Sequence, residues 1–241
     1  MSIPRQEIKF ASEEISQIHL DEILKINNFK ELYSPRVIYS TYCDTINDTF
    51  LVENIEGHGY RKKIRVRYYQ NINKFSHPSA INLEEKRKYI SSTTKVRETL
   101  TEDKYTITHI YDQEYNDKIP IVLPNDRMYP GLVPKCIVAY NRRYYTDNNI
   151  RLTVDNSIRV AEIDSHTHSV SNFYQLKRFI IAELKSGLTT DLREYERMML
   201  NISSVNRTKL SKYVLARSFF NPTIDCYYPE QTRFGSATKK Y

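Results

Sequence analysis

The sequence predicts an α+β domain organised around an antiparallel β-barrel with a polar, basic interior and helices on its flanks. Three observations support this fold class. A long middle segment, 37–155, is rich in Val, Ile, Thr and Tyr, the residues typical of strands. Several strand-like segments alternate charged and apolar side chains. Helical spacing of apolar residues occurs only before and after this middle segment.

The N-terminal segment predicts a strand followed by a helix. Residues 5–11 alternate polar and apolar side chains with a period of two. Ser12 is then placed to cap a helix whose first turn contains Glu13 and Glu14, and whose apolar face contains isoleucines up to Ile26. We therefore expect the helix to follow the strand directly.

The middle segment, 37–155, predicts a series of antiparallel strands. Breaks are expected near 57–59, 71–78, 116–118 and 120–134, where Gly, Pro and Asn accumulate. Connections this short are typical of antiparallel neighbours.

The C-terminal part predicts one more strand and two helices. The strand covers 179–185 and ends at Ser186 and Gly187, and Thr190 is placed to cap the first helix. A second helix is expected over 207–219. We therefore expect one domain, residues 1–220, followed by a C-terminal tail, residues 221–241.

Charged residues share one face in several of the expected strands. One such row is Arg5, Glu7 and Lys9, and others occur at 63–67, 151–155 and 183–185. A solvated outer face explains this pattern in most single strands. Like charges at this spacing repel one another unless an anion or a carboxylate lies between them, and here several strands repeat the pattern. A barrel that turns these faces inward would collect the cations around one lumen.

Composition narrows the classes of partner. Lys plus Arg exceeds Asp plus Glu by 7, which favours an anionic partner such as a nucleotide, a phosphate polymer or nucleic acid. The 5 glycines form neither a Walker-type loop nor a dinucleotide-binding fingerprint.

No apolar run is long enough for a membrane span, and 3 widely spaced cysteines are typical of free thiols. We therefore expect a cytoplasmic protein. His166 and His168 lie in a polar segment and are expected to be a solvated loop rather than metal ligands.

Short motifs in a constant order resemble the triphosphate tunnel metalloenzyme superfamily, and within it the VTC domain, the polyphosphate polymerase domain of vacuolar transporter chaperones. The motifs span residues 5–213: RQEIKF, YSTYCDT, RKKIRVRY, LEEKRK, YNRR with RLTVD, AELK, and SKY. This resemblance implies an eight-stranded antiparallel tunnel that binds a nucleoside triphosphate and a divalent metal ion, Mn²⁺ or Mg²⁺. The implied partners are ATP and inorganic polyphosphate or orthophosphate, with ADP as the other product.

The resemblance also implies roles for individual residues. Phosphate-binding and catalytic roles fall on Lys9, Arg65, Arg67, Lys86, Arg142, Arg151 and Lys212. Further substrate contacts are expected from Arg5, Lys63, Lys88, Tyr140, Lys185 and Ser211. The resemblance implies metal binding by Glu183. Glu7 and Glu84 are further candidate metal ligands on different grounds, because carboxylates on the charged strand faces offer the hard oxygen atoms that a divalent cation prefers.

Two alternatives to a polymerase remain. The first is a hydrolase of the same fold that acts on tripolyphosphate, a nucleoside triphosphate or an RNA 5′ end. Tunnel RNA triphosphatases typically have a pair of glutamates, one residue apart, on both the first and a late strand. Arg5 and Lys185 occupy one place of each pair here, and the more positive lumen favours holding a polyphosphate over hydrolysing a triphosphate. The other alternative is a module that binds phosphate polymers or nucleic acid without catalysis, since Tyr60, Tyr68 and Tyr69 surround the basic stretch 61–67.

Overall fold

A computed structural model describes residues 5–13, 15–71, 74–90, 92–112, 117–128, 130–176 and 179–224. The strands are β1 (Arg5–Ser12), β2 (Lys30–Asp44), β3 (Tyr60–Asn71), β4 (Lys74–Tyr89), β5 (Ser92–Thr99), β6 (Tyr105–Asp112), β7 (Asp117–Pro124), β8 (Val133–Thr146), β9 (Arg151–Glu162), β10 (Tyr174–Gln175), β11 (Ile180–Gly187) and β12 (Asn206–Thr208). The helices are α1 (Gln17–Ile26), α2 (Thr49–Ile55), α3 (Arg193–Leu200) and α4 (Lys212–Phe220), with a 3₁₀ turn at Glu102–Lys104.

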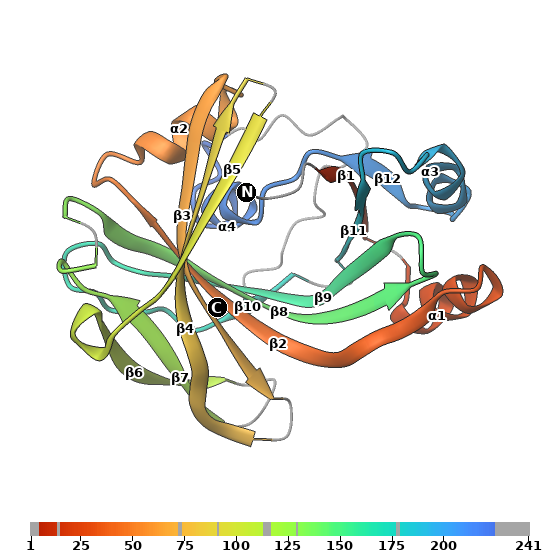
Figure 1. The fold of residues 1–241 in the computed structure, drawn as a ribbon. Coiled ribbons are helices and arrows are strands. Elements are labelled where there is room, and N and C mark those ends of the chain that lie inside the picture. The colour runs from red at the N-terminus through yellow and green to blue at the C-terminus, as the bar shows by residue number, and fades with distance from the viewer. Residues whose placement is uncertain are drawn as a thin grey trace.

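Ten of the strands form one strongly curved antiparallel sheet. The order along it is β12-β1-β11-β9-β8-β2-β3-β4-β5, and β10 pairs with β9. The sheet bends so that β3, β4 and β5 form one wall while β1 and β11 form the other, with β9, β8 and β2 between them (Figure 1). The predicted α+β class is confirmed. The expectation of eight strands is corrected, since the sheet has ten. Within the described residues, no backbone pairing joins β5 to β12.

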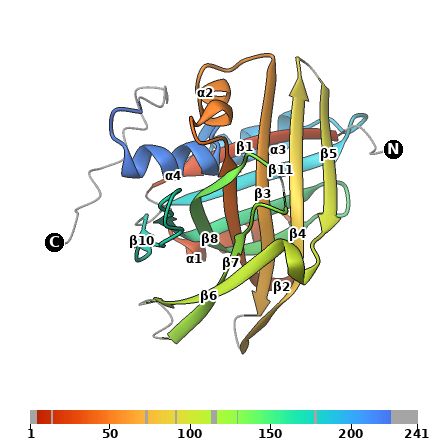
Figure 2. The ribbon, with the colours of Figure 1, turned by 90° about the vertical axis from the view of Figure 1, so that its left-hand side faces the viewer.

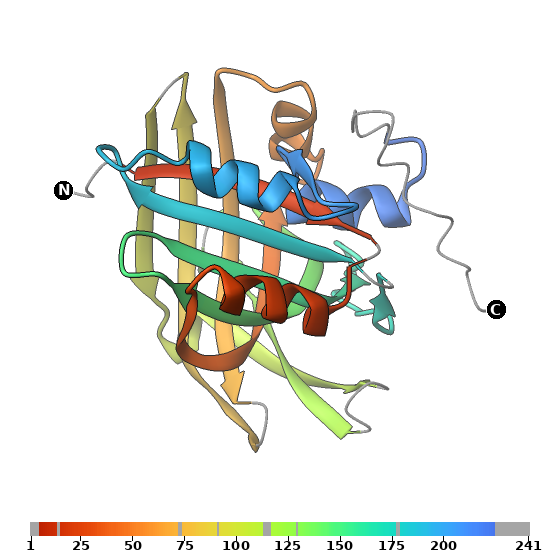
Figure 3. The same cartoon turned by 90° about the vertical axis from the view of Figure 1, so that its right-hand side faces the viewer.

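Two of the three apolar clusters lie on the outer side of the curved sheet. One packs Phe10, Leu152 and Leu184 against residues of α1 and α3, including Leu20 and Met199. Both helices lie on the outer side of the sheet, α3 in front of β1 and β11, and α1 in front of β8 and β9 (Figure 3). The other packs the outer side of β2, β3 and β4 against the separate β6–β7 hairpin (Figure 2). Much of the apolar core therefore lies outside the curved sheet.

The third cluster lies on the inner side, beneath α4. It joins Val214 and Leu215 of α4 to Ile38, Val138 and Ile158 of the central strands. An irregularity in β9 makes this possible: Asn156 pairs with Asn141 but Arg159 pairs with Ala139, so β9 contains one extra residue. Ser157, with φ of 47°, lies in this bulge. Because of the extra residue, Asp155 and Ile158 both face the interior.

Several predicted boundaries are wrong. Strand β1 continues through Ser12, which pairs with Ile180, and α1 begins later, with the Ser16 side chain accepting a hydrogen bond from the His19 amide. Leu192 precedes the first residue of α3, so Thr190 is not its cap. The last helix begins at Lys212 rather than Arg207, because residues 206–208 pair with β1 as β12.

Two further differences lie in the middle segment. The expected break over 120–134 contains most of β7, a strand of a two-stranded sheet that tolerates Pro120 and Pro124. Helix α2 was not expected at all. It begins after Asp48 at a φ of 58°, and the Asp44 carboxylate accepts hydrogen bonds from the amides of Phe50 and Leu51 at 2.9 and 2.8 Å.

Candidate functional site

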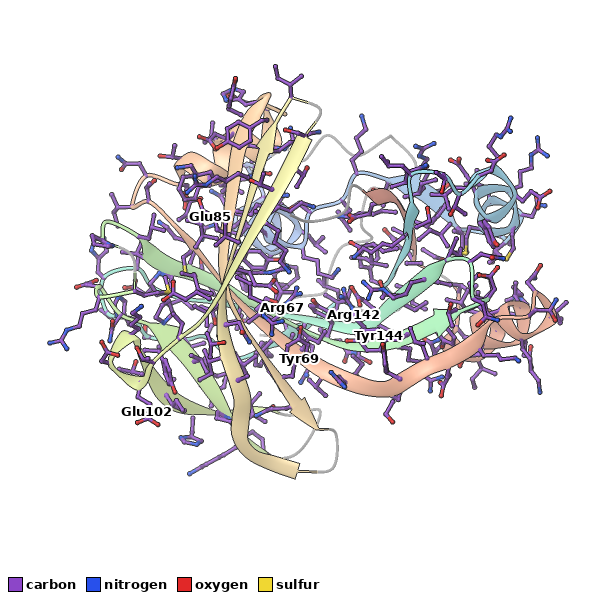
Figure 4. The ribbon with its side chains drawn as sticks, in the orientation of Figure 1. Arg67, Tyr69, Glu85, Glu102, Arg142 and Tyr144 are labelled. Carbon is purple, nitrogen blue, oxygen red and sulfur yellow. The ribbon has the colours of Figure 1, made fainter. Side chains whose placement is uncertain are left out.

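The inner face of the curved sheet collects charged side chains from both walls. Strand pairing brings Lys9 opposite Glu183, and Glu183 opposite Thr153. On the other wall, pairing brings Arg65 opposite Glu84, and Lys63 opposite Lys86. Because alternate residues share a face, each of these rows extends the charged row predicted for its strand. Arg67 and Tyr69 on β3, and Arg142 and Tyr144 on β8, follow the inside of the bend (Figure 4).

Two glutamates and two lysines form a compact cluster where β1 pairs with β11. The Lys9 Nζ lies 3.3 Å from both Glu7 Oε1 and Glu183 Oε1, and Lys185 Nζ lies 2.6 Å from Glu183 Oε2. Burial alone would raise the pKa of the Glu183 carboxyl, but Lys9 and Lys185 hold it well below its usual value. Burial likewise opposes the charge on Lys9, but Glu183 and Glu7 outweigh it and raise the pKa of this amine. Glu7, Glu183 and Lys9 therefore favour their charged forms in this cluster.

Glu84 organises three cations on the opposite wall. Its Oε2 accepts hydrogen bonds from Arg65 Nε and Nη2 at 2.9 and 2.7 Å, and it lies 3.4 Å from Arg67 Nη1. Lys95 Nζ donates to Glu84 Oε1 at 2.7 Å. Burial works against ionisation of Glu84, but Arg65 and Arg67 hold the pKa of its carboxyl far below the usual value. Glu84 therefore fixes the directions of the two arginines.

A third cluster joins the central strands to α4. Asp155, which is 1% exposed, accepts hydrogen bonds from Arg142 Nε at 2.5 Å and Nη2 at 2.7 Å, and its Oδ2 lies 2.6 Å from Lys212 Nζ. The buried Tyr140 hydroxyl accepts a hydrogen bond from Arg67 Nη2 at 3.0 Å, and Lys212 Nζ lies 4.8 Å from the Tyr140 ring centre. Ser211 precedes the first residue of α4. Residues from β3, β8, β9 and α4 thus meet at one point.

Charges on the two walls act on each other across the bend. Burial lowers the pKa of the Lys63 amine well below its usual value, and the charges on Lys9 and Lys86 lower it further. Burial also lowers the pKa of Lys86, and both Glu7 and Lys9 on the other wall contribute to its environment. Since β1 and β4 are not neighbours in the sheet, their side chains approach across the interior rather than along a strand pair.

Positive charge on this face exceeds what the carboxylates neutralise. Within the described part of the chain, Lys63, Lys86 and Arg151 make no ion pair, and the buried Arg151 Nε has no hydrogen-bond partner. Lys88 continues the Lys63–Lys86 row toward the end of β4, opposite Arg61. Arg5 is described only by its backbone, which pairs with Gly187, so the expected role of its side chain lies outside the described side chains.

Glu7 and Glu183 are the carboxylates of this cluster that could hold a divalent cation. Lys9 contacts both of them, and the charge on Glu183 acts on the pKa of the Glu7 carboxyl, so the two groups lie near each other. Mg²⁺ and Mn²⁺ prefer oxygen ligands, and Mg²⁺ is commonly held by one or two carboxylates together with substrate phosphates and water. No group of three or more His, Cys, Asp and Glu ligands occurs among the described residues. Substrate oxygens would therefore have to complete the coordination.

Several inner-face residues were not singled out in the sequence. Lys95 and Arg97 lie on β5, where Arg97 Nε donates to Asn82 Oδ1 at 3.0 Å, and both are near Glu84 or its neighbours. Asp155 was noted only as part of an alternating strand, although it binds both Arg142 and Lys212. The alternation in 93–97 was the available signal for Lys95 and Arg97. His166 and His168 lie exposed in a turn, as predicted.

The fold and the site together define a class of protein: an α+β protein with a curved antiparallel sheet whose inner face is lined by cations and a smaller number of carboxylates. A family model for the VTC domain matches residues 4–221, and the chain belongs to this family. No curated protein matches the chain.

Solved structures show a weaker likeness. A protein assigned as an adenylate cyclase, from Vibrio parahaemolyticus, has 11% identity and a TM-score of 0.48, and the match covers 87% of this chain and 97% of that one. A Hippeastrum protein described as an adenylyl cyclase with a dominant triphosphatase activity has 12% identity and a TM-score of 0.44, covering 88% and 94%. The RNA triphosphatase Pct1 of S. pombe has 10% identity and a TM-score of 0.30, covering 94% and 87%. Likeness at this level assigns neither a substrate nor a reaction.

None of the helices in the described part of the chain has both the length and the apolar character needed to cross a bilayer.

Proposed function

We propose that this protein is a metal-dependent polyphosphate polymerase that transfers the γ-phosphoryl group of ATP to the end of a polyphosphate chain. The observation that carries the proposal is the gathering of inward-facing Lys and Arg side chains on both walls, beside the Glu7–Glu183 pair. Membership of the VTC-domain family supports it. A closed tunnel of the kind expected for such an enzyme would require the two walls to meet, and the strand pairs of the described sheet do not join β5 to β12.

The side chains supply what phosphoryl transfer needs. The reaction depends mainly on positioning and on cations placed against the oxygens of the transferred group. Arg65, Arg67 and Arg142 are held in fixed directions by Glu84 and Asp155, so they are preorganised to bind those oxygens. Arg151 carries an Nε–H without a partner, which a phosphate oxygen would satisfy.

The proposed binding surface also includes Lys212, Tyr140 and the basic residues that have no carboxylate partner. Lys212 shares the Asp155 carboxylate with Arg142, so a triphosphate would compete with Asp155 for both. Lys9 and Lys185 lie on either side of the Glu7–Glu183 pair, where a divalent cation, when bound, would neutralise charge on the phosphates.

The acceptor, orthophosphate or a polyphosphate end, is already anionic, so the reaction needs no separate general base. Lys63, Lys86 and Lys88 form a basic path for the product.

Activity of two variants tests the proposal. Wild-type protein incubated with ATP and Mn²⁺ is expected to form polymer detectable by gel staining, whereas Arg65→Ala and Glu183→Gln are expected to reduce synthesis by at least about a hundredfold. Arg193→Ala is the matched control, because Arg193 pairs with Asp191 on the exposed surface at α3. Circular dichroism checks that each variant is folded. Synthesis at the wild-type rate by either site variant would refute the assignment.

A hydrolase acting on tripolyphosphate or a nucleoside triphosphate is the second candidate, because the same cations and carboxylates bind the same group. Phosphate release without polymer, from ATP or from tripolyphosphate, would identify it. Binding of polyphosphate without turnover, with or without metal, would identify a non-catalytic module. Two of the tyrosines near the basic stretch do not combine with the inner cations to form a nucleic-acid surface. Tyr68 is fully buried and stacks on Tyr39, and Tyr60, although exposed, lies on the outer face beside Tyr89.

A further inference from the structure

An aromatic surface with an adjoining arginine lies at one end of the basic inner face. Tyr33 on β2 and Tyr144 on β8 pair across the strands, and their rings meet edge to face with centres 5.6 Å apart. Tyr33 is 52% exposed, and Arg36 beside it is also exposed. A bulge at 34–35 permits this arrangement, since Arg36 pairs with Arg142 while Tyr33 pairs with Tyr144. Both tyrosines thereby face the same side as the arginines.

The surface adjoins the proposed phosphate-binding residues. Arg142 and Tyr144 are two positions apart on one face of β8, a separation of about 7 Å. Burial raises the pKa of the Tyr144 hydroxyl, and Arg142 and Arg36 act against that rise, so both guanidinium groups lie near this phenol. Tyr69, which is half-buried, contributes to the same environment from β3. Figure 4 shows Tyr69, Arg142 and Tyr144 close to one another inside the bend.

We propose that Tyr33 and Tyr144, with Arg36, form a stacking platform for the nucleobase of a nucleoside triphosphate whose phosphates lie along Arg142 and Arg67. An exposed tyrosine ring provides a face on which a base can stack, and an arginine beside it adds cation–π and phosphate contacts. Stacking of this kind selects nucleotides over inorganic tripolyphosphate and discriminates little among bases. The proposal rests on the proposed function, because it assumes that a triphosphate occupies the inner face.

The test compares two ligands on three proteins. Binding of a non-hydrolysable ATP analogue and of tripolyphosphate is measured by calorimetry for wild type, Tyr33→Ala and Tyr60→Ala. Tyr60 is the matched control, because its ring also meets a cross-strand tyrosine edge to face, at 5.4 Å, but on the outer face. We expect Tyr33→Ala to weaken the analogue by about tenfold and leave tripolyphosphate unchanged, with no effect from Tyr60→Ala. Tyr33→Trp should retain the preference for the nucleotide.

The outcomes separate this proposal from the proposed function. If Tyr33→Ala weakens both ligands equally, or weakens neither, the stacking platform is overturned. The proposal that the inner face binds a triphosphate would still stand, because the wild type binds both ligands. Wild-type protein that binds neither ligand overturns the proposed function and the platform with it. Turnover does not enter the measurement, so a protein that binds triphosphates without making polymer still gives a decisive comparison.

Discussion

At the scale of a single residue, Lys63 shows that the inner face has too few negative charges beside its basic side chains. Its amine is surrounded by Lys9, Lys86, Arg61 and Arg65, and burial together with these charges lowers its pKa well below the usual value. In the unfolded chain that pKa returns to about 10.5. The folded protein therefore binds fewer protons than the unfolded chain at pH values between the lowered pKa and about 10.5, and over that window its stability rises with pH.

A bound polyanion is expected to raise the pKa of Lys63 again, so the affinity for that polyanion should depend on pH. Phosphate oxygens next to Lys63 favour its protonated form, so binding of tripolyphosphate is expected to take up protons. The affinity should therefore fall as the pH rises through the lowered pKa toward 10.5. Calorimetry in buffers of different ionisation enthalpy measures the uptake, and Lys63→Met should reduce it. The exposed Lys25 on α1 provides a control as Lys25→Met. Affinity that does not change with pH in the wild type would contradict this explanation.

At the scale of an element, α4 is tied to the sheet by a buried hydrogen bond adjacent to Lys212. The Tyr213 hydroxyl donates to Asp44 Oδ2 at 2.7 Å, and the Tyr213 ring stacks on Tyr42 with centres 5.1 Å apart. The Tyr42 hydroxyl in turn accepts a hydrogen bond from Arg65 Nη1 at 3.2 Å. Asp44 also binds the first amides of α2, so one carboxylate holds two helices. This network sets where Lys212 enters the site.

Removing parts of this network should destabilise the protein in a definite order. Tyr213→Phe loses one buried hydrogen bond and is expected to lower the free energy of unfolding by about 1–2 kcal/mol. Asp44→Ala also leaves the amides of Phe50 and Leu51 unpaired, and we expect about 3 kcal/mol or more. Tyr195→Phe, which removes a partly buried hydrogen bond to Asp147 at 2.5 Å, is the comparison and should cost less than Tyr213→Phe. Urea unfolding measures all three. A smaller loss for Asp44→Ala than for Tyr213→Phe would exclude this account.

The element scale also shows what the sequence could and could not predict. The charged faces of β1, β3, β9 and β11 were predicted because side chains in a strand alternate with a period of two, whatever the tertiary structure. The bulge at Ser157 breaks that period, so the common direction of Asp155 and Ile158 was not predictable. The predicted start of the first helix was wrong because Ser12, a residue typical of helix caps, pairs with Ile180 as part of a strand instead.

At the scale of the whole molecule, the proposed function depends on two walls that share no strand pair in the described sheet. Lys9 and Glu7 belong to one wall and Lys63 and Lys86 to the other, yet their charges influence one another. The sequence predicted the members of each wall, and the expected barrel already turned their charged faces toward one another. Which side chains of the two walls approach each other is set by the curvature of the sheet, so these pairs could not be predicted. The outer layers, α1 and α3 on one wall and the β6–β7 hairpin on the other, stabilise each wall separately.

A single polyanion should therefore stabilise both walls at once. Tripolyphosphate at a hundred times its Kd is expected to raise the free energy of unfolding by about 2.7 kcal/mol, as for any ligand that binds only the folded state. The distinctive expectation concerns location: hydrogen exchange should slow in β1 and β11 and also in β3 and β4, since cations on both walls would contact the same ligand. Orthophosphate, which spans less of the interior, is the control and should protect fewer of these strands at the same fractional occupancy. Protection confined to one wall would show that the inward cations do not act as one site, because a ligand held by Arg65 and Arg67 alone would leave the amides around Lys9 and Glu183 exchanging as before.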